Sequence, residues 1–261
     1  MELTTIEFDV AEHVATITLD RPEALNSFTD RMGVEMTWAW GETVRDTSEI
    51  HAVVLQANGD LAFSTGADIT GEMTWIFKEN LWGWEDPGVR LSPKFHHKVW
   101  KPVVTAVHGI CAGGGQYFVN EADIVICSDD AVFFDPHANA QIVSSVEGIG
   151  MLHRGVPLGD VLRWALMGTE ERITAETALR LGLVTEVVPR GDLRSRAREI
   201  AVSIAERNPV AIQGSVRAIW ESLDVNRTMG IVAGFNYTTI GNEPAEKRRG
   251  RPRTNRPPSF R

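Results

Sequence analysis

Three short apolar runs, each of buried-strand length, constrain the fold of this chain most strongly. They are AVVLQA (Ala52–Ala57), PVVTAVHG (102–109) and DIVICS (123–128). Strands that are apolar on both faces are typical of a parallel sheet covered by helices. Because segments with helical patterns stand between or after these runs, the sequence predicts an α/β fold.

Other segments extend this pattern at both ends of the chain. VATITLD (14–20) alternates like a half-buried strand, and AVFFDP (131–136) predicts a short strand. We expect one helix over residues 30–45 and another over 211–222. The segment DLRSRAREIAVSIAERNP predicts an amphipathic helix, whose apolar face is formed by Leu193, Ala197, Ile200, Ala201 and Ile204.

A shorter helix is expected in TAETALRLG. Its Ala178, Leu179 and Leu181 are spaced to pack, and Gly182 is expected to cap its carboxyl end. The neighbouring pair His96 and His97, in KFHHKVW, is expected on a solvated helix face.

Composition limits the function classes that remain. The chain has 261 residues, a formal charge of −9 and two cysteines. An acidic body disfavours nucleic-acid binding, and two cysteines are too few for a disulfide framework or a zinc cluster. The segment MELTTIEFDV lacks the features of a signal peptide, and no apolar run approaches the ~18 residues that span a bilayer. We therefore expect a cytoplasmic protein with no bound metal.

The segment GICAGGGQYFVNEADIVIC carries three consecutive glycines, Gly113 to Gly115, between a strand and a predicted helix. Glycine lets a ligand approach the backbone closely, and a helix N-terminus offers unpaired N–H groups. Together they suit an anion or a developing oxyanion. A tight turn that requires small residues explains the run equally well. The spacing is neither that of a Walker A loop nor that of a dinucleotide fold.

A second glycine loop, FSTGADI (63–69), also follows a strand and a turn. Ligands in open α/β sheets gather beyond the carboxyl ends of strands. Backbone N–H groups from the two loops are therefore placed to converge on one carbonyl oxygen. The competing interpretation is a surface turn in which Asp68 caps a helix.

These segments together resemble the crotonase (enoyl-CoA hydratase/isomerase) superfamily. DRPEALNSF (20–28) is similar to its early CoA-binding segment, FSTGADI to its first oxyanion loop, and KPVVTAVHGICAGGG (101–115) to its central motif. ITAETALRLGLVTEVVP (173–189) is similar to the segment after the core, so the resemblance runs from about residue 14 to 209.

The resemblance implies an α/β fold that spirals through ββα units. It implies a core over residues 1–190 and a C-terminal helical trimerisation region with a basic tail over 191–261. Homotrimers or dimers of trimers are expected. Coenzyme A would enter as part of an acyl-CoA substrate, with no permanently bound cofactor. The matching positions for CoA contacts are Glu23, Ala24, Leu25, Ala67, Asp68 and Ile69, and the thioester oxygen would be held by the N–H groups of Ala67 and Gly114.

Two departures bear on the reaction. Hydratases of the family carry one glutamate two residues after the glycine run and another after the proline of a strand-end motif. Tyr117 and His137 stand at these positions. Since both carboxylates are absent, we expect hydrolase or isomerase chemistry rather than simple hydration.

His137 titrates near neutrality and is a candidate base. Glu147, ten residues on, is a candidate partner that orients the imidazole. Family hydrolases that cleave a C–C bond between carbonyls use a histidine with an acidic partner, so a CoA-independent hydrolase of a cyclic β-diketone is the alternative. Tyr117 either lines the pocket or donates a hydrogen bond to substrate or water. A purely structural role for His137 stays open, and Asp135 and Glu121 are weaker candidates without a distinctive context.

Two further segments have competing interpretations. Trp75, Trp82 and Trp84 follow the first oxyanion loop and indicate either a bulky acyl pocket or ordinary core. KRRGRPRTNR (247–256) carries six basic residues and no acid. The ending RPPSF (256–260) resembles the basic C-termini of family members, which implies a tail that contacts CoA phosphates through its arginines. The alternative is a solvated tail. RGRPR also resembles an AT-hook, which would make a non-catalytic or DNA-tethered binder, but a single short match on an acidic body disfavours this.

Overall fold

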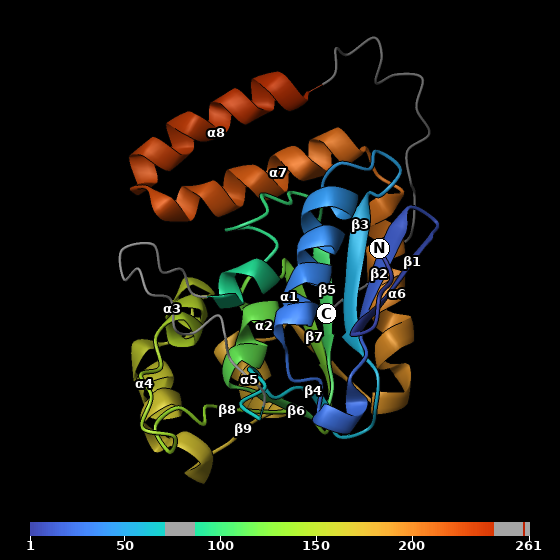
Figure 1. Ribbon diagram of the computed structural model, residues 1–261. Helices are drawn as coiled ribbons and strands as arrows, with labels where there is room; N and C mark the ends of the chain where they lie inside the picture. The colour runs from blue at the N-terminus through green and yellow to red at the C-terminus, as the bar shows by residue number, and fades with distance from the viewer. Residues whose placement is uncertain (71–86, 243–257, 259–261) are drawn as a thin grey trace, which may run out of the picture.

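The computed structural model describes residues 1–70, 87–242 and 258, and its strands form two sheets (Figure 1). The larger sheet has six strands in the order β1-β2-β3-β5-β7-β10. β1 is antiparallel to β2, and all other neighbours are parallel. The strands are β1 (Ile6–Ala11), β2 (Val14–Leu19), β3 (Ala52–Ala57), β5 (Val103–Val107), β7 (Ile124–Ser128) and β10 (Glu186–Val188).

The smaller sheet has four strands in the order β4-β6-β8-β9. β4, β6 and β8 run parallel, and β9 is antiparallel to β8. Because β3 and β4, β5 and β6, and β7 and β8 are successive pairs, each pair gives one strand to each sheet. The chain thus winds through both sheets, which confirms the predicted α/β spiral. The strands are β4 (Ala62–Ser64), β6 (Ile110–Ala112), β8 (Val132–Phe134) and β9 (Ile173–Thr174).

Helices cover the sheets and form the C-terminal region (Figure 1). A π-helix, Trp38–Val44, continues α1, so the helix predicted over 30–45 is confirmed. The helix predicted over 211–222 is α7. The helices are α1 (Asp30–Thr37), α2 (Tyr117–Asn120), α3 (Val146–His153), α4 (Leu158–Met167), α5 (Ala175–Leu181), α6 (Leu193–Ala205), α7 (Pro209–Glu221) and α8 (Arg227–Gly241).

The larger sheet is buried on both faces, as its apolar runs predict. One face packs against α1, α2 and the smaller sheet around Trp40, Phe63 and Phe118. The other face is covered by α6, whose Leu193, Ala197 and Ala201 are fully or almost fully buried. The alanines let the helix lie close to the sheet. The predicted apolar face of this helix is therefore confirmed.

The helix expected in TAETALRLG is α5. Ala178 and Leu181 are buried as predicted, and Gly182 caps the helix in the left-handed conformation with φ of 78°. The expectation for Leu179 is wrong, because its side chain is 43% exposed. It lies one position after Ala178, and successive helical residues point about 100° apart.

The expectation of a solvated helix face at His96 and His97 is wrong about the helix and about His97, whereas His96 is exposed as expected. These residues lie in turns, and His97 is only 4% exposed. His97 Nε2 lies 2.8 Å from the carbonyl oxygen of Arg90. Burial lowers the pKa of His97 to about 4, despite this contact, so the imidazole is neutral at pH 7. The neighbouring lysines Lys94 and Lys98 made the segment look solvated in the sequence, although His97 is buried.

The α7–α8 hairpin projects from the rest of the chain (Figure 1). One anchor is the indole N–H of Trp220, which donates to Asp123 Oδ1 at 2.7 Å. Asp123 Oδ2 is paired with the buried Lys94 ammonium at 2.8 Å. Since α6 packs on the larger sheet, the projecting part begins at Pro209.

No helix of the described ranges is long and apolar enough to cross a bilayer.

Two groups of predictions fall outside the described residues. Trp75, Trp82 and Trp84 lie in the segment 71–86, and the basic tail at 247–256 lies beyond residue 242. The ending RPPSF (256–260) also lies outside the described residues, except for residue 258.

A buried carboxylate fixes the start of the chain to α1. Glu35, with no exposed side-chain area, accepts hydrogen bonds from the backbone N–H groups of Thr4, Thr5 and Ile6 and from both threonine hydroxyls. Arg31 adds an ion pair at 2.6 Å. Burial alone would raise the pKa of Glu35, but the hydrogen bonds from Thr5, Thr4 and Arg31 outweigh it and lower the pKa to about 2.

We expect Glu35→Gln to lower the free energy of unfolding at pH 7 by about 3 kcal/mol, at roughly 1.4 kcal/mol per pKa unit. Because the folded pKa lies below the ordinary value of 4.5, the contribution is complete above pH 4.5 and is lost as the pH falls through about 2. Urea unfolding of wild type and variant between pH 7 and pH 3 measures the difference. Glu42→Gln, on the exposed side of the same helical run, is the control. A difference that stays constant with pH would contradict this account.

Candidate functional site

Two glycine loops leave the smaller sheet side by side. β4 and β6 are neighbouring parallel strands, so the loops that follow them start from the same edge. Gly66 has φ of +87°, a conformation that favours glycine, and a methyl group there would lie 2.7 Å from the backbone nitrogen of Gly114. The two loops therefore touch backbone to backbone, and Gly66 must lack a side chain for them to do so.

Both candidate N–H donors lie at this contact. Ala67 forms an isolated parallel bridge with Phe28, in which Phe28 N donates to Gly66 O and Asp68 N donates to Phe28 O. That pattern leaves the Ala67 N–H out of the bridge. Gly114 is the second residue of a 3-10 turn, Gly113–Gln116, whose first N–H groups have no intrahelical partner. Neither N–H donates to another described residue.

The predicted CoA-binding segment packs against the first loop. Glu23, Ala24 and Leu25 lie in or beside a 3-10 turn, Pro22–Ala24, at the surface. The Arg21 guanidinium pairs with Asp68 Oδ2 at 3.0 Å and joins the two segments. Glu23, Ala24, Leu25, Ala67, Asp68 and Ile69 are thereby held in one region of the molecule.

The structure also gives Asp68 a local role. Its Oδ1 accepts from Thr70 N at 3.0 Å and from the Thr70 hydroxyl at 2.6 Å. These hydrogen bonds, with help from Arg21, lower the pKa of Asp68. The side chain closes the turn from Asp68 to Thr70.

Asn26 holds this region together and was not singled out by the sequence. It is fully buried with φ of 53°, and its amide donates to the carbonyl oxygens of Asn58 and Ala62 at 2.8 and 3.0 Å. Ser64 returns a hydrogen bond to Asn26 O at 2.8 Å. A left-handed asparagine directly before a strand-like segment is a turn signal, but its distant partners are visible only in the fold.

His137 lies between two carboxylates beside the glycine loop. It follows β8, and a methyl group at Gly113 would lie 3.6 Å from His137 Cε1. Its Nε2 is 3.7 Å from Glu147 Oε1, in the first turn of α3, and its Nδ1 contacts Asp135 Oδ1. Asp135 also accepts from His137 N at 3.1 Å. Both carboxylates are almost or completely buried, while the imidazole is 21% exposed.

Asp135 is therefore the buried partner of His137, which its position in the sequence did not reveal. Burial would raise its pKa, but hydrogen bonds from His137 and Ser144 outweigh this and lower it. The orienting position at Nδ1 belongs to Asp135, whereas Glu147, the predicted orienting partner, faces Nε2. Glu121, the other weak candidate, accepts from the backbone N–H groups of Lys94 and Phe95 and caps that turn.

The Tyr117 side chain packs beside Gly114. Its side chain is 6% exposed, and its ring lies 6.2 Å from that of Phe28 in an edge-to-face arrangement. A methyl group at Gly114 would lie 3.1 Å from the Tyr117 ring and 2.7 Å from Phe28, and one at Gly88 would collide with Tyr117 at 2.3 Å. The tyrosine thus occupies tightly packed space at the loop.

The described residues contain no group of three His, Cys, Asp or Glu side chains that could hold a metal ion. The two cysteines, Cys111 and Cys127, are buried, and burial raises the pKa of both thiols. Among the described residues, the polar groups gathered beside the glycine loops are backbone N–H groups, an imidazole and two carboxylates.

Known proteins share this architecture. The sequence profile of the Enoyl-CoA hydratase/isomerase family matches residues 9–236, which extends the resemblance beyond both predicted limits. The (E)-benzylidenesuccinyl-CoA hydratase of Thauera aromatica is 31% identical over 233 residues, 87% of this chain and 86% of that protein. The short-chain-enoyl-CoA hydratase of Clostridium acetobutylicum is 35% identical, covering 84% and 82%.

The solved structures agree. An enoyl-CoA hydratase/isomerase from Mycobacterium paratuberculosis superposes with a TM-score of 0.86 at 34% identity, covering 95% of this chain and 94% of that one. The chain belongs to the enoyl-CoA hydratase/isomerase family of the crotonase superfamily and is an enzyme of that family.

Proposed function

We propose that this enzyme binds an acyl-CoA thioester and stabilises its enolate, with proton transfer by His137 and Glu147. The observation that supports this proposal most strongly is the position of the His137 imidazole, between Asp135 and Glu147 and next to the glycine loop. The family relatives named above act on CoA thioesters, which supports the substrate class.

The backbone supplies the electrostatic part of the reaction. A thioester oxygen placed between the N–H groups of Ala67 and Gly114 gains two fixed donors. Removing a proton from the α-carbon sends the electron pair toward this oxygen, and the donors stabilise the charge that develops there. Because the donors belong to loops that touch at Gly66, their separation is preset before substrate arrives.

The side chains supply the proton transfer. Asp135, at Nδ1, fixes the tautomer that leaves Nε2 to exchange a proton. Glu147 lies 3.7 Å from that atom, so a bridging water or a shorter approach with substrate bound would carry a proton between them. Returning the proton to a different carbon completes an isomerisation. Tyr117 and His137 replace the two carboxylates of a hydratase, so plain hydration by that pair is not proposed.

A second candidate is a hydrolase of cyclic β-diketones that does not require CoA. The buried Asp135 next to His137 supports it, because such a pair can activate water. Hydroxide adds to one carbonyl, the bond to the carbon between the carbonyls breaks, and that carbon leaves as an enolate that takes up a proton. The same N–H groups would hold the enolate oxygen.

A homotrimer is proposed for the assembly. The α7–α8 hairpin exposes a row of large apolar side chains, among them Ile219, Val232, Phe235 and Ile240. A second exposed apolar surface lies on α3 and α4, around Ile149, Leu158, Leu162 and Leu166. In Figure 1 the helices α7 and α8 lie at the top of the view, and α3 and α4 lie at the lower left. Two unlike apolar surfaces suit a head-to-tail contact that closes into a ring.

The first prediction concerns the backbone donor. In Gly114→Pro the N–H is lost, and deuterium incorporation at the α-carbon of an acyl-CoA in D₂O should slow by about 10²–10³. Mass spectrometry over a panel of saturated and unsaturated acyl-CoA thioesters measures this rate. Gly114→Ala is the matched control, because its methyl group meets Phe28 equally but its N–H remains. Equal losses in both variants would contradict the proposed donor.

The second prediction concerns the imidazole. His137→Ala should slow α-proton exchange, or hydrolysis of a cyclic β-diketone if that is the reaction, by about 10²–10⁴. Asp135→Asn should slow the same reaction and also shift the neutral tautomer of His137, measured by ¹⁵N NMR of the imidazole. Asp129→Asn, exposed on the turn before β8, should change neither. A wild-type rate for His137→Ala on both substrate classes would overturn the assignment.

The third prediction concerns assembly. Val232→Glu with Phe235→Glu on α8 should convert a trimer into a monomer, because both side chains are mostly exposed in one chain. Light scattering after size-exclusion chromatography reports the mass. Val10→Glu, an exposed apolar position on β1, should leave the trimer intact. A wild type that is monomeric at micromolar concentration would refute the proposal.

A further inference from the structure

Glu147, the proposed proton-transfer partner of His137, is held through its main chain by a residue of another helix. The side-chain amide of Asn120 donates from Nδ2 to the carbonyl oxygen of Glu147 at 2.9 Å, and this hydrogen bond is buried. Asn120 itself is only 6% exposed. The contact joins the last residue of α2 to the first turn of α3.

Asn120 ends the helical segment that begins with the glycine loop. The 3-10 turn Gly113–Gln116 continues directly into α2 (Tyr117–Asn120). Gly114, whose N–H is the proposed oxyanion donor, lies near the start of this segment. One short helical segment thus carries the proposed donor and, through Asn120, contacts the backbone of Glu147.

Gly150 leaves the space that this amide occupies. A methyl group at Gly150 would lie 2.2 Å from Asn120 Nδ2 and 2.7 Å from its Cβ, so the asparagine would have to move. Glycine in the interior of a helix costs about 1 kcal/mol relative to alanine. The close approach of Asn120 gives a physical reason for a glycine in the middle of α3.

The oxygen of the same amide is buried without a hydrogen-bond partner among the described residues. A buried amide that is only partly satisfied lowers stability, and a leucine of similar shape would avoid that cost. Stability alone therefore does not account for an asparagine at this position. Its distinctive contact is the hydrogen bond that Asn120 donates to the first turn of α3.

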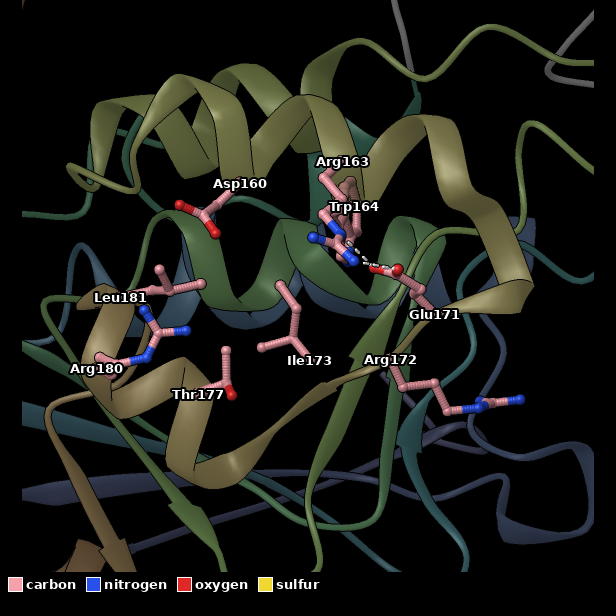
Figure 2. Close-up of a pocket in the computed structure, with 9 residues that line it drawn as sticks. All are labelled: Asp160, Arg163, Trp164, Glu171, Arg172, Ile173, Thr177, Arg180 and Leu181. Atoms are coloured by element: carbon pink, nitrogen blue, oxygen red, sulfur yellow. Dashed lines mark hydrogen bonds and ion pairs between the residues drawn. The ribbon is translucent and has the colours of Figure 1, made fainter.

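A second contact of α3 is less directional. A methyl group at Gly148 would lie 3.3 Å from Val161 Cγ1, so α3 packs there against an apolar side chain of α4. The α4 helix is tied in turn to the segment before β9 by Arg163, which donates to both oxygens of Glu171 at 2.7 and 2.6 Å (Figure 2). Apolar packing has no preferred direction, whereas a hydrogen bond fixes the position of its acceptor. The hydrogen bond from Asn120 is therefore the more restrictive contact.

We propose that Asn120 is a positioning residue, which sets the distance between Glu147 and the Gly114 donor through its hydrogen bond to the Glu147 carbonyl group. The inference rests on the proposed function, because it gives Asn120 a part in placing the proton-transfer group. The hydrogen bond holds the backbone, so it places the carboxylate without engaging its oxygens.

The first measurement does not depend on the reaction. Asn120→Leu keeps the approximate shape of the side chain but removes the donor, and Gly150→Ala displaces the amide instead. In both variants, ¹⁵N NMR of the imidazole should show the Nε2 resonance of His137 moved from its wild-type position, as in Glu147→Gln, because the carboxylate that faces this atom has shifted. Gly150→Ala gains helix propensity, so it provides the test if Asn120→Leu does not fold.

Thr105→Val is the matched control. The buried hydroxyl of Thr105 donates to the carbonyl oxygen of Phe118 at 3.2 Å, so this variant also removes a buried donor to a main-chain carbonyl. Phe118 belongs to α2, and the contact does not involve α3. Thr105→Val should therefore leave the Nε2 resonance in place. An unmoved resonance in Asn120→Leu and Gly150→Ala, or an equal movement in Thr105→Val, would overturn the proposal.

The second measurement uses the reaction. Asn120→Leu should lower kcat for α-proton exchange by about ten- to a hundredfold with KM little changed, because a misplaced proton-transfer group slows the chemical step. In a Glu147→Gln background, the same substitution should have almost no further effect. Equal losses in both backgrounds would contradict a role through Glu147. A wild type without α-proton exchange would refute the proposed function instead, and the NMR measurement would still decide the role of Asn120.

Discussion

The backbone contact between the Gly66 and Gly114 loops is the constraint on which the site depends. It arises because β4 and β6 are parallel neighbours, so the loops that follow them start at one edge. A side chain at Gly66 would force the loops apart. The buried Asn26 and the Arg21–Asp68 pair then fix the 20–28 segment against the first loop. The spacing of the two N–H donors is therefore a property of the sheet rather than of a flexible loop.

The groups proposed for proton transfer follow the next strand of the smaller sheet. β8 lies beside β6 in the smaller sheet, so residues after β8 reach the Gly113 end of the second loop. Asp135 and His137 come from that strand end and Glu147 from α3, which gives the imidazole a carboxylate at each nitrogen. Tyr117, held by Phe28 and Gly88, fills space next to Gly114. The neighbouring parallel strands β4, β6 and β8 thus place the proposed oxyanion site and the proposed base side by side.

The residues and their family resemblance predicted the α/β spiral and the two neighbouring glycine loops, and they pointed to His137, whose role stays a prediction. These signals are local: apolar runs, glycines at strand ends and a histidine at a motif position. Asp135, Asn26 and His97 were misjudged or overlooked because their significance comes from partners or burial that the chain brings together only on folding. The repeated placement of strand pairs is likewise a feature of the fold, since the sequence shows no internal repeat.

A crystal structure with a non-reactive acyl-CoA analogue tests the central claim most directly. We predict that the thioester oxygen lies about 2.7–3.1 Å from the backbone nitrogens of both Ala67 and Gly114. The α-carbon should face His137 Nε2. A bound analogue whose carbonyl lies away from both nitrogens, with its α-carbon out of reach of His137, would contradict the account.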